Sequence, residues 1–246
     1  MNPYDNYSKK ELKELKKGVD KKLKEYKSQN LDLNMARGKP CSKQLELSNG
    51  LYNNIQSFTS NSGIDCRNYG GLEGLPEARK LFAELLKVDV DELIIGGNSS
   101  LSFMYDTVAR AFTHGLYKSS KPWSKIDKIK FLCPSPGYDR HFAICELFGI
   151  EMITIPYNDD GPDMDMVEEM VCSNDSVKGI WCVPKYSNPT GIVYSDEVVN
   201  RLANMKTKAE DFTIFWDNSY IVHHLSDNPP ELKNILKTCK KAGNPD

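Results

Sequence analysis

The stretch from Ser187 to Tyr220 constrains the fold of this chain more than any other part of the sequence. It begins with Asn-Pro-Thr-Gly at residues 188–191, a combination that is typical of a turn. It ends with an apolar, β-branched and aromatic run at residues 212–216, which is typical of a buried strand. Between the two, Ser195 followed by Asp and Glu predicts the N-cap and the acidic first turn of a helix. The stretch is therefore predicted to fold as loop, helix and strand.

Three polar side chains lie at the ends of these predicted elements. Asn188 stands in the turn, Asp217 directly follows the strand, and Tyr220 comes shortly after it. Open α/β folds bind their ligands outside the carboxyl ends of the strands. We therefore expect Asn188, Asp217 and Tyr220 to line a ligand site at that edge of the sheet.

Short apolar runs alternate with segments of helical periodicity along most of the chain. This alternation predicts an α/β fold, a mostly parallel sheet sandwiched by helices, with right-handed crossovers. We expect the sheet to be incomplete, with its last strand as an unpaired edge. The predicted strands are residues 93–95, 129–133, 151–157, 177–183 and 212–216. The predicted helices include one that begins near Pro76, one opened by Ser195, and residues 101–116, 142–148, 164–171 and 229–242.

The N-terminal part of the chain is predicted to form a helical arm. Residues 8–27 are rich in charge, and their few apolar residues recur at helical spacing. Such a helix packs one narrow stripe on another surface and does not fold alone. We therefore expect two domains, residues 1–64 with the helix and the loop that follows it, and residues 65–246 as a ligand-binding domain.

Composition excludes several classes of protein. The chain has 246 residues, a formal charge of −2, 39% hydrophobic residues and 27% charged residues, as in soluble globular proteins. No long basic run with aromatic residues indicates nucleic acid binding, and no apolar run approaches the length of a membrane span. Seven cysteines form no C-x-x-C pair, which favours free thiols in a reducing, cytoplasmic setting.

A glycine-rich turn at residues 96–100 is a candidate anion site. It follows a predicted strand and precedes a predicted helix, so free backbone N–H groups and the helix dipole face the loop. Gly97, Asn98 and Ser99 are the proposed ligands within it. The turn matches neither a Walker loop nor the Gly-x-Gly-x-x-Gly fingerprint of dinucleotide sites, which disfavours an unrelated nucleotide-binding domain.

The loop at residues 188–191, followed by Asp217-Asn-Ser-Tyr220, resembles the core of class I aminotransferases, which belong to the fold type I enzymes that use pyridoxal phosphate. The resemblance implies that Asp217 pairs with the pyridinium nitrogen of the cofactor, and that Asn188 and Tyr220 bond its phenolic oxygen. A carboxylate near that nitrogen keeps it protonated, and a protonated ring is the electron sink of the reaction. The glycine turn would hold the cofactor phosphate.

The same resemblance assigns roles to residues elsewhere in the chain. Gly38 would lie against the substrate carboxylate, and Tyr69 would reach the cofactor phosphate of the partner subunit in a homodimer. Tyr138 would stack on the pyridine ring, although its spacing from the preceding strand departs from the common pattern by a residue or two. His141 is an alternative for stacking or bonding, but we favour an ordinary residue of a first helical turn.

Two further features are interpreted as ordinary surface. Lys185 lies near the predicted site, and a solvated loop lysine is favoured over a catalytic one. His223 and His224 with Asp227 invite a metal assignment, but no further ligand has the required spacing, so no metal is expected.

The lysine that holds the cofactor as a Schiff base in the resembled family has no match here. In that family it lies beyond the pyridine-pairing Asp, after one more helix and strand, so it is expected past the end of this chain. The implied function is amino-group transfer between an amino acid and a 2-oxo acid, with this chain expected to be inactive by itself. A lyase of the same fold, and a non-catalytic aminotransferase-like module for ligand sensing or dimerisation, remain open.

Overall fold

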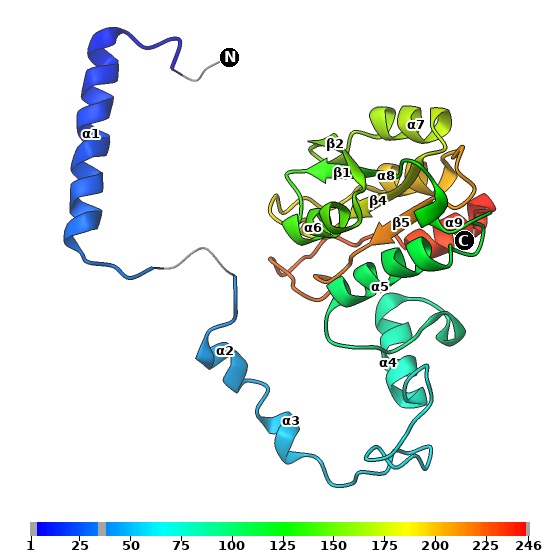
Figure 1. Cartoon of the computed structure of the whole chain (residues 1–246). Coiled ribbons are helices and arrows are strands. Elements are labelled where there is room, and N and C mark those ends of the chain that lie inside the picture. The colour runs from blue at the N-terminus through cyan, green and yellow to red at the C-terminus, as the bar shows by residue number, and fades with distance from the viewer. Residues whose placement is uncertain (1–3, 34–37, 245–246) are drawn as a thin grey trace. The chain divides into compact units, whose positions relative to one another are not determined.

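The computed structural model describes residues 4–33 and 38–244. The chain divides into two compact units, residues 1–58 and residues 59–246 (Figure 1). The predicted domain boundary after residue 64 stays a prediction. In the described ranges, no helix combines the length and the apolar character needed to cross a bilayer.

The described residues of the first unit form three helices, none of whose residues is buried. Helix α1 (Lys9–Ser28) begins with a reciprocal capping box, in which Ser8 accepts from the backbone of Glu11 and Glu11 accepts from the backbone of Ser8. The apolar stripe predicted for this helix is present, and its side chains are exposed. Two short helices follow, α2 (Ser42–Glu46) and α3 (Gly50–Asn53).

The second unit is built on one five-stranded sheet. Its order is β3-β2-β1-β4-β5, and β2, β1, β4 and β5 are mutually parallel, which confirms the predicted α/β class. Strand β3 pairs antiparallel with β2 and was not predicted. Strand β5 is an edge, as expected. The strands are β1 (Lys130–Ser135), β2 (Glu151–Asn158), β3 (Gly161–Pro162), β4 (Val177–Cys182) and β5 (Thr213–Trp216).

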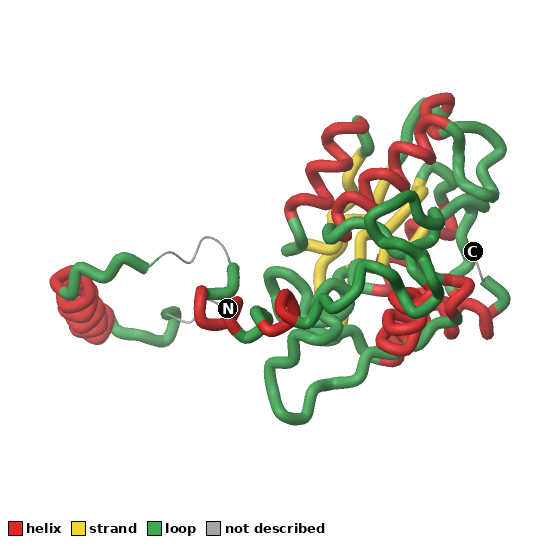
Figure 2. Tube along the Cα trace, turned by 90° about the horizontal axis from the view of Figure 1, so that it is seen from below, coloured by secondary structure: helices red, strands yellow, loops and turns green. Residues whose placement is uncertain are grey.

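Helices cover both faces of this sheet, as Figure 2 shows. Alternating side chains of β1, β4 and β5 belong to two separate apolar clusters: Leu132 and Ile180 pack with α7 and α8, whereas Phe131, Trp181 and Phe215 pack with α5 and α6. The helices of the unit are α4 (Pro76–Leu86), α5 (Ser100–Thr113), α6 (Asp139–Phe148), α7 (Met164–Ser173), α8 (Asp196–Asn204) and α9 (Ile235–Ala242), with 3-10 turns η1 (Val90–Glu92) and η2 (Trp123–Lys125).

The predicted strand at residues 93–95 is wrong. This segment has no partner strand in the described part of the chain, and its only ladder-like bond runs from the N–H of Ile95 to the carbonyl of Glu73, at 2.9 Å. Arg79 of α4 fastens it by donating to the carbonyls of Val90 and Leu93 at 2.7 and 3.0 Å. A β-rich sequence forms a strand only where a neighbour is there to pair with it.

The predicted helix at residues 229–242 begins later than expected. Its first part contains Pro229 and Pro230, and the residue before a proline is disfavoured in the helical region. The helix begins only after Asn234, whose side chain accepts from the backbone of Lys237 at 2.8 Å as an N-cap.

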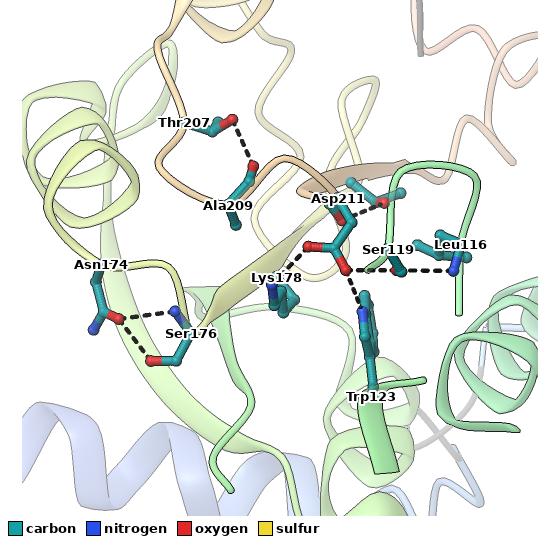
Figure 3. A network of polar contacts seen from close by, with 10 residues as sticks. Leu116, Ser119, Trp123, Asn174, Ser176, Lys178, Thr207, Ala209 and Asp211 are labelled. Atoms are coloured by element: carbon teal, nitrogen blue, oxygen red, sulfur yellow. Dashed lines mark hydrogen bonds and ion pairs between the residues drawn. The ribbon is translucent and has the colours of Figure 1, made fainter. Parts of the chain in front are cut away.

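A closed polar network ties β4 and β5 to the connection between α5 and β1 (Figure 3). The buried carboxylate of Asp211 accepts from Lys178 Nζ at 2.6 Å, from Ser119 Oγ at 2.6 Å and from Trp123 Nε1 at 2.8 Å. Burial raises the pKa of Asp211, but bonds from Lys178, Ser119 and Trp123 outweigh it, so the pKa lies below its ordinary value. Lys178 lies near the start of β4 and Asp211 lies just before the start of β5, so both are away from the predicted ligand edge.

Replacing Asp211 by Asn should lower the free energy of unfolding by about 3–5 kcal/mol at pH 7, because it leaves the buried ammonium of Lys178 without a countercharge. Urea unfolding followed by circular dichroism measures this. Glu210→Gln, at the exposed neighbouring position, is the control and should stay within about 0.5 kcal/mol. Equal stability of the two variants would contradict the assigned role of the ion pair.

Candidate active site

The carboxyl ends of three neighbouring strands carry the candidate site. Because β1, β4 and β5 are adjacent and parallel, the segments that follow them emerge at one edge of the sheet. These segments are the start of α6, the loop with Asn188 and the loop that begins with Asp217. This is where open α/β folds bind ligands.

Asp217 is the centre of the site. Its side chain is buried, and its carboxylate takes hydrogen bonds from three different segments. Ser100 Oγ of α5 donates to Oδ2 at 3.0 Å, His141 Nε2 of α6 lies 3.0 Å from the same oxygen, and Ser219 Oγ lies 2.5 Å from Oδ1. An ionised carboxylate only accepts, so Nε2 of His141 carries the proton in this contact.

These contacts keep Asp217 ionised. Burial raises the pKa of the carboxyl, but the hydrogen bonds from His141, Ser219 and Ser100, together with the attraction of the His141 ring, outweigh that effect. The pKa of Asp217 therefore lies below its ordinary value. The site presents a buried, permanently negative oxygen pair at neutral pH.

An aromatic layer holds His141 in place. The ring of His141 stacks on Trp181 of β4, with centroids 4.8 Å apart and planes 15° apart. Tyr138, the N-cap of α6, meets His141 edge to face at 5.1 Å. His141 is buried, so the interpretation of an ordinary first-turn histidine is wrong, because this side chain is committed to Asp217.

Asn188 and Tyr220 lie side by side, as predicted from the sequence. Asn188 Nδ2 donates to Tyr220 Oη at 3.4 Å, a long contact, and both side chains are half-buried. Their amide and phenol groups therefore converge from two different strand ends. The contact is weak enough to be exchanged for a bond to a ligand.

The predicted anion turn precedes α5, whose first residue contacts Asp217. Ser99 is the N-cap residue, but its side chain makes no capping bond, which leaves first-turn N–H groups of a 14-residue helix without that partner. Gly97 is exposed with open space around it, whereas a side chain at Gly96 would collide with the ring of Phe103. Asn98 is exposed. Their role as phosphate ligands stays a prediction.

The roles predicted for Tyr69 and Gly38 stay predictions. Tyr69 is completely exposed, and its backbone N–H bonds the neighbouring side chain of Asn68 at 2.8 Å. Gly38 is exposed and belongs to the first unit, residues 1–58. Both assignments therefore rest on the sequence resemblance.

Sequence reasoning did not anticipate three contacts of Asp217, although it had named His141 as an alternative for stacking or bonding. Ser100, His141 and Ser219 all touch Asp217, and only the order of the strands in the sheet brings them together. A signal was present for Ser219, which lies two residues after Asp217 in the same loop. Lys185 was also misjudged, because it is buried and not solvated. Among the described residues no group of three potential ligands could hold a metal ion.

Comparisons with known proteins show which family the chain resembles. The chain matches the aspartate amino-transferase family over residues 7–246. A protein of Mycolicibacterium smegmatis is 50% identical over 225 residues, which cover 90% of this chain and 53% of that protein. The aspartate aminotransferase of Corynebacterium glutamicum is 47% identical over 229 residues, covering 92% of this chain and 53% of the enzyme.

Solved structures show the same similarity. An aspartate transaminase from Corynebacterium glutamicum superimposes with a TM-score of 0.91 at 44% identity, over 98% of this chain and 57% of that one. LysN, an α-aminoadipate aminotransferase from Thermus thermophilus solved with N-(5'-phosphopyridoxyl)-L-leucine, shares the fold at a TM-score of 0.50 and 20% identity, over 69% of this chain and 39% of that one.

Replacing His141 by Phe should keep an aromatic ring beside Trp181 but remove the donor to Asp217. We expect a loss of about 1–3 kcal/mol in unfolding free energy at pH 7, measured in urea. The lowered pKa means that the bond stabilises the fold above the unfolded pKa of about 3.9, and that this stabilisation disappears as the pH falls through the folded pKa. The cost of the substitution should therefore shrink below about pH 4. His224→Phe, at an exposed position, serves as the control, and a pH-independent cost would contradict the assignment.

Proposed function

The chain belongs to the aspartate aminotransferase family, and we propose that the protein containing it transfers an amino group between an amino acid and a 2-oxo acid, with pyridoxal phosphate as cofactor. The chain spans about half the length of the curated relatives it matches, 53% in both cases reported above. The observation that carries the proposal is the buried, ionised carboxylate of Asp217 at the carboxyl end of β5.

The residues present fit this cofactor. A protonated pyridine nitrogen needs a buried anion, and Asp217 supplies one. Its carboxylate also accepts hydrogen bonds from His141 and Ser219. A phenolic oxygen needs donors, and Asn188 and Tyr220 offer an amide and a hydroxyl within reach of each other. A phosphate suits the first turn of α5, where Ser99 leaves backbone donors uncapped.

Each of these side chains has a defined task in the proposed reaction. When bound, pyridoxal phosphate supplies the electron sink that stabilises negative charge at the α-carbon of an amino acid. Asp217 stays ionised at neutral pH because its pKa lies below the ordinary value, and its negative charge would favour a proton on the ring nitrogen. His141 and Trp181 fix the carboxylate in position, so that no reorganisation is needed during the reaction. Asn188 and Tyr220 orient the ring, and Tyr138 is the proposed stacking residue.

Substrate, location and assembly are proposed from the relatives and the sequence. Aspartate is the amino acid named for the Corynebacterium glutamicum enzymes, and we extend it to this protein. The seven cysteines are all free in the structure, which suits the reducing cytoplasm. The complete exposure of Tyr69 is compatible with a homodimer in which it contacts the cofactor phosphate of the partner subunit.

Replacing Asp217 by Ala should weaken pyridoxal phosphate binding at least tenfold, which corresponds to about 1.4 kcal/mol, because the ring nitrogen loses its anion. Titration followed by cofactor absorbance measures the dissociation constant. Asn188→Ala should bind more tightly than Asp217→Ala but shift the absorbance maximum. Asp227→Ala, an exposed aspartate, is the matched control. If Asp217→Ala binds like the control while circular dichroism shows an intact fold, the site assignment is wrong.

The in-trans role of Tyr69 has its own test. Tyr69→Phe should weaken cofactor binding several-fold under conditions in which sedimentation shows a dimer, because the hydroxyl to the partner's phosphate is lost. Tyr117→Phe, which changes a tyrosine that is 90% exposed, should have no effect. A monomer that binds the cofactor equally well with and without the Tyr69 hydroxyl would contradict the dimer proposal.

A further inference from the structure

A second cavity lies beside β5, apart from the cluster around Asp217. Its volume is about 760 Å³, and it is bounded by the end of α4, the end of β5 and the segment before α9. Trp216 and Asn218, the residues on either side of Asp217, line it, whereas Asp217 does not. Trp216 packs with the α7 and α8 cluster, so the cavity belongs to the face of the sheet opposite to α5 and α6.

Lys185 is the charged group of this cavity that lacks a countercharge. It is 6% exposed, and its Nζ donates to the backbone carbonyl of Ile221 at 3.4 Å and lies 5.5 Å from the ring centroid of Tyr186. Within residues 4–33 and 38–244 it forms no ion pair. Buried ammonium groups are costly unless they are paired, and a 3.4 Å bond to a neutral oxygen is a weak substitute. The group lacks an anion.

Asn218 adds an independent polar signal in the same cavity. Its Oδ1 is buried and has no hydrogen-bond partner among the described residues. A buried acceptor without a partner costs about 1–3 kcal/mol, so such atoms are rare in native proteins. A ligand with an N–H or O–H group would satisfy it once the side chain turns this oxygen, which solvent does not reach in the structure, toward the cavity.

The other walls suit an apolar body. Leu85, Ile221, Leu232 and Trp216 contribute hydrocarbon and aromatic surface. The volume falls within the range of about 300–1,000 Å³ that is typical of small-molecule sites.

The remaining lysines of the lining are already engaged at its rim. Lys87 lies 3.8 Å from Glu231, and Lys233 lies 3.7 Å from Asp196. Asp227 and His224 are exposed residues of the same lining. Lys185 is therefore the cation that remains for an anionic ligand.

We propose that this cavity binds a small organic acid that combines a carboxylate, a neutral N–H or O–H donor and an apolar body. The carboxylate contacts Lys185 Nζ, the donor contacts Asn218 Oδ1, and the apolar body packs against Trp216 and Leu232. Hydroxy acids with aromatic side chains have this chemistry. The site is separate from the proposed cofactor site and does not depend on it.

Calorimetric titration of the 246-residue chain with 3-phenyllactate tests the proposal. We expect 3-phenyllactate to bind at least tenfold more tightly than its neutral amide, 3-phenyllactamide, and more tightly than 3-phenylpropanoate, which lacks the hydroxyl. Lys185→Met should reduce the advantage of the acid over the amide to less than twofold. Lys233→Met, which removes a lysine from the rim of the same cavity, should retain the full advantage.

Each opposite result overturns the proposal. Equal affinity for the acid and the amide, or no binding of either compound, on the unmodified chain excludes an anion site at Lys185, and this comparison needs no variant to fold. If Lys185→Met, with its fold verified by thermal unfolding, still binds the acid tenfold more tightly than the amide, the carboxylate does not contact Lys185.

Discussion

The buried carboxylate of Asp217 is the interaction on which the candidate site depends. An ionised group of this kind is tolerated inside a protein only when its lone pairs are occupied. Here the donors come from α5, from α6 and from the loop after β5, three segments that are far apart in the sequence. Satisfying this one charge therefore fixes the start of α5 and the ring of His141 against the end of β5.

Strand β5 carries a buried carboxylate near each end, and the two are satisfied differently. Asp211 is paired with Lys178, so the charges of the network at the amino end are balanced and the network stabilises the fold. Asp217 is surrounded by hydroxyl groups and an imidazole, and it pairs with no lysine or arginine of the described residues. It therefore keeps its negative charge available for a cationic ligand group. The same residue type thus serves the fold at one end of the strand and the chemistry at the other.

The sequence predicted correctly those features that depend on residues close together in the chain. Alternating strands and helices predicted the parallel sheet, and turn residues predicted that Asn188 and Tyr220 converge. It failed where the outcome depends on distant partners. Residues 93–95 have the composition of a strand but no neighbour to pair with, and Lys185 lies on a loop that the rest of the fold buries. His141 looked ordinary because its importance comes from Asp217, which only the strand order brings next to it.

The free edge of β5 has a consequence for handling the chain in solution. Residues 213–216 read Thr-Ile-Phe-Trp, with no charge and no proline, and one row of their backbone groups has no partner strand in the described part of the molecule. Natural edges usually carry a lysine, a proline or a bulge that deters intermolecular pairing. This edge has none of these within the strand. The protein should therefore aggregate more readily as its concentration rises than its near-neutral net charge alone would suggest.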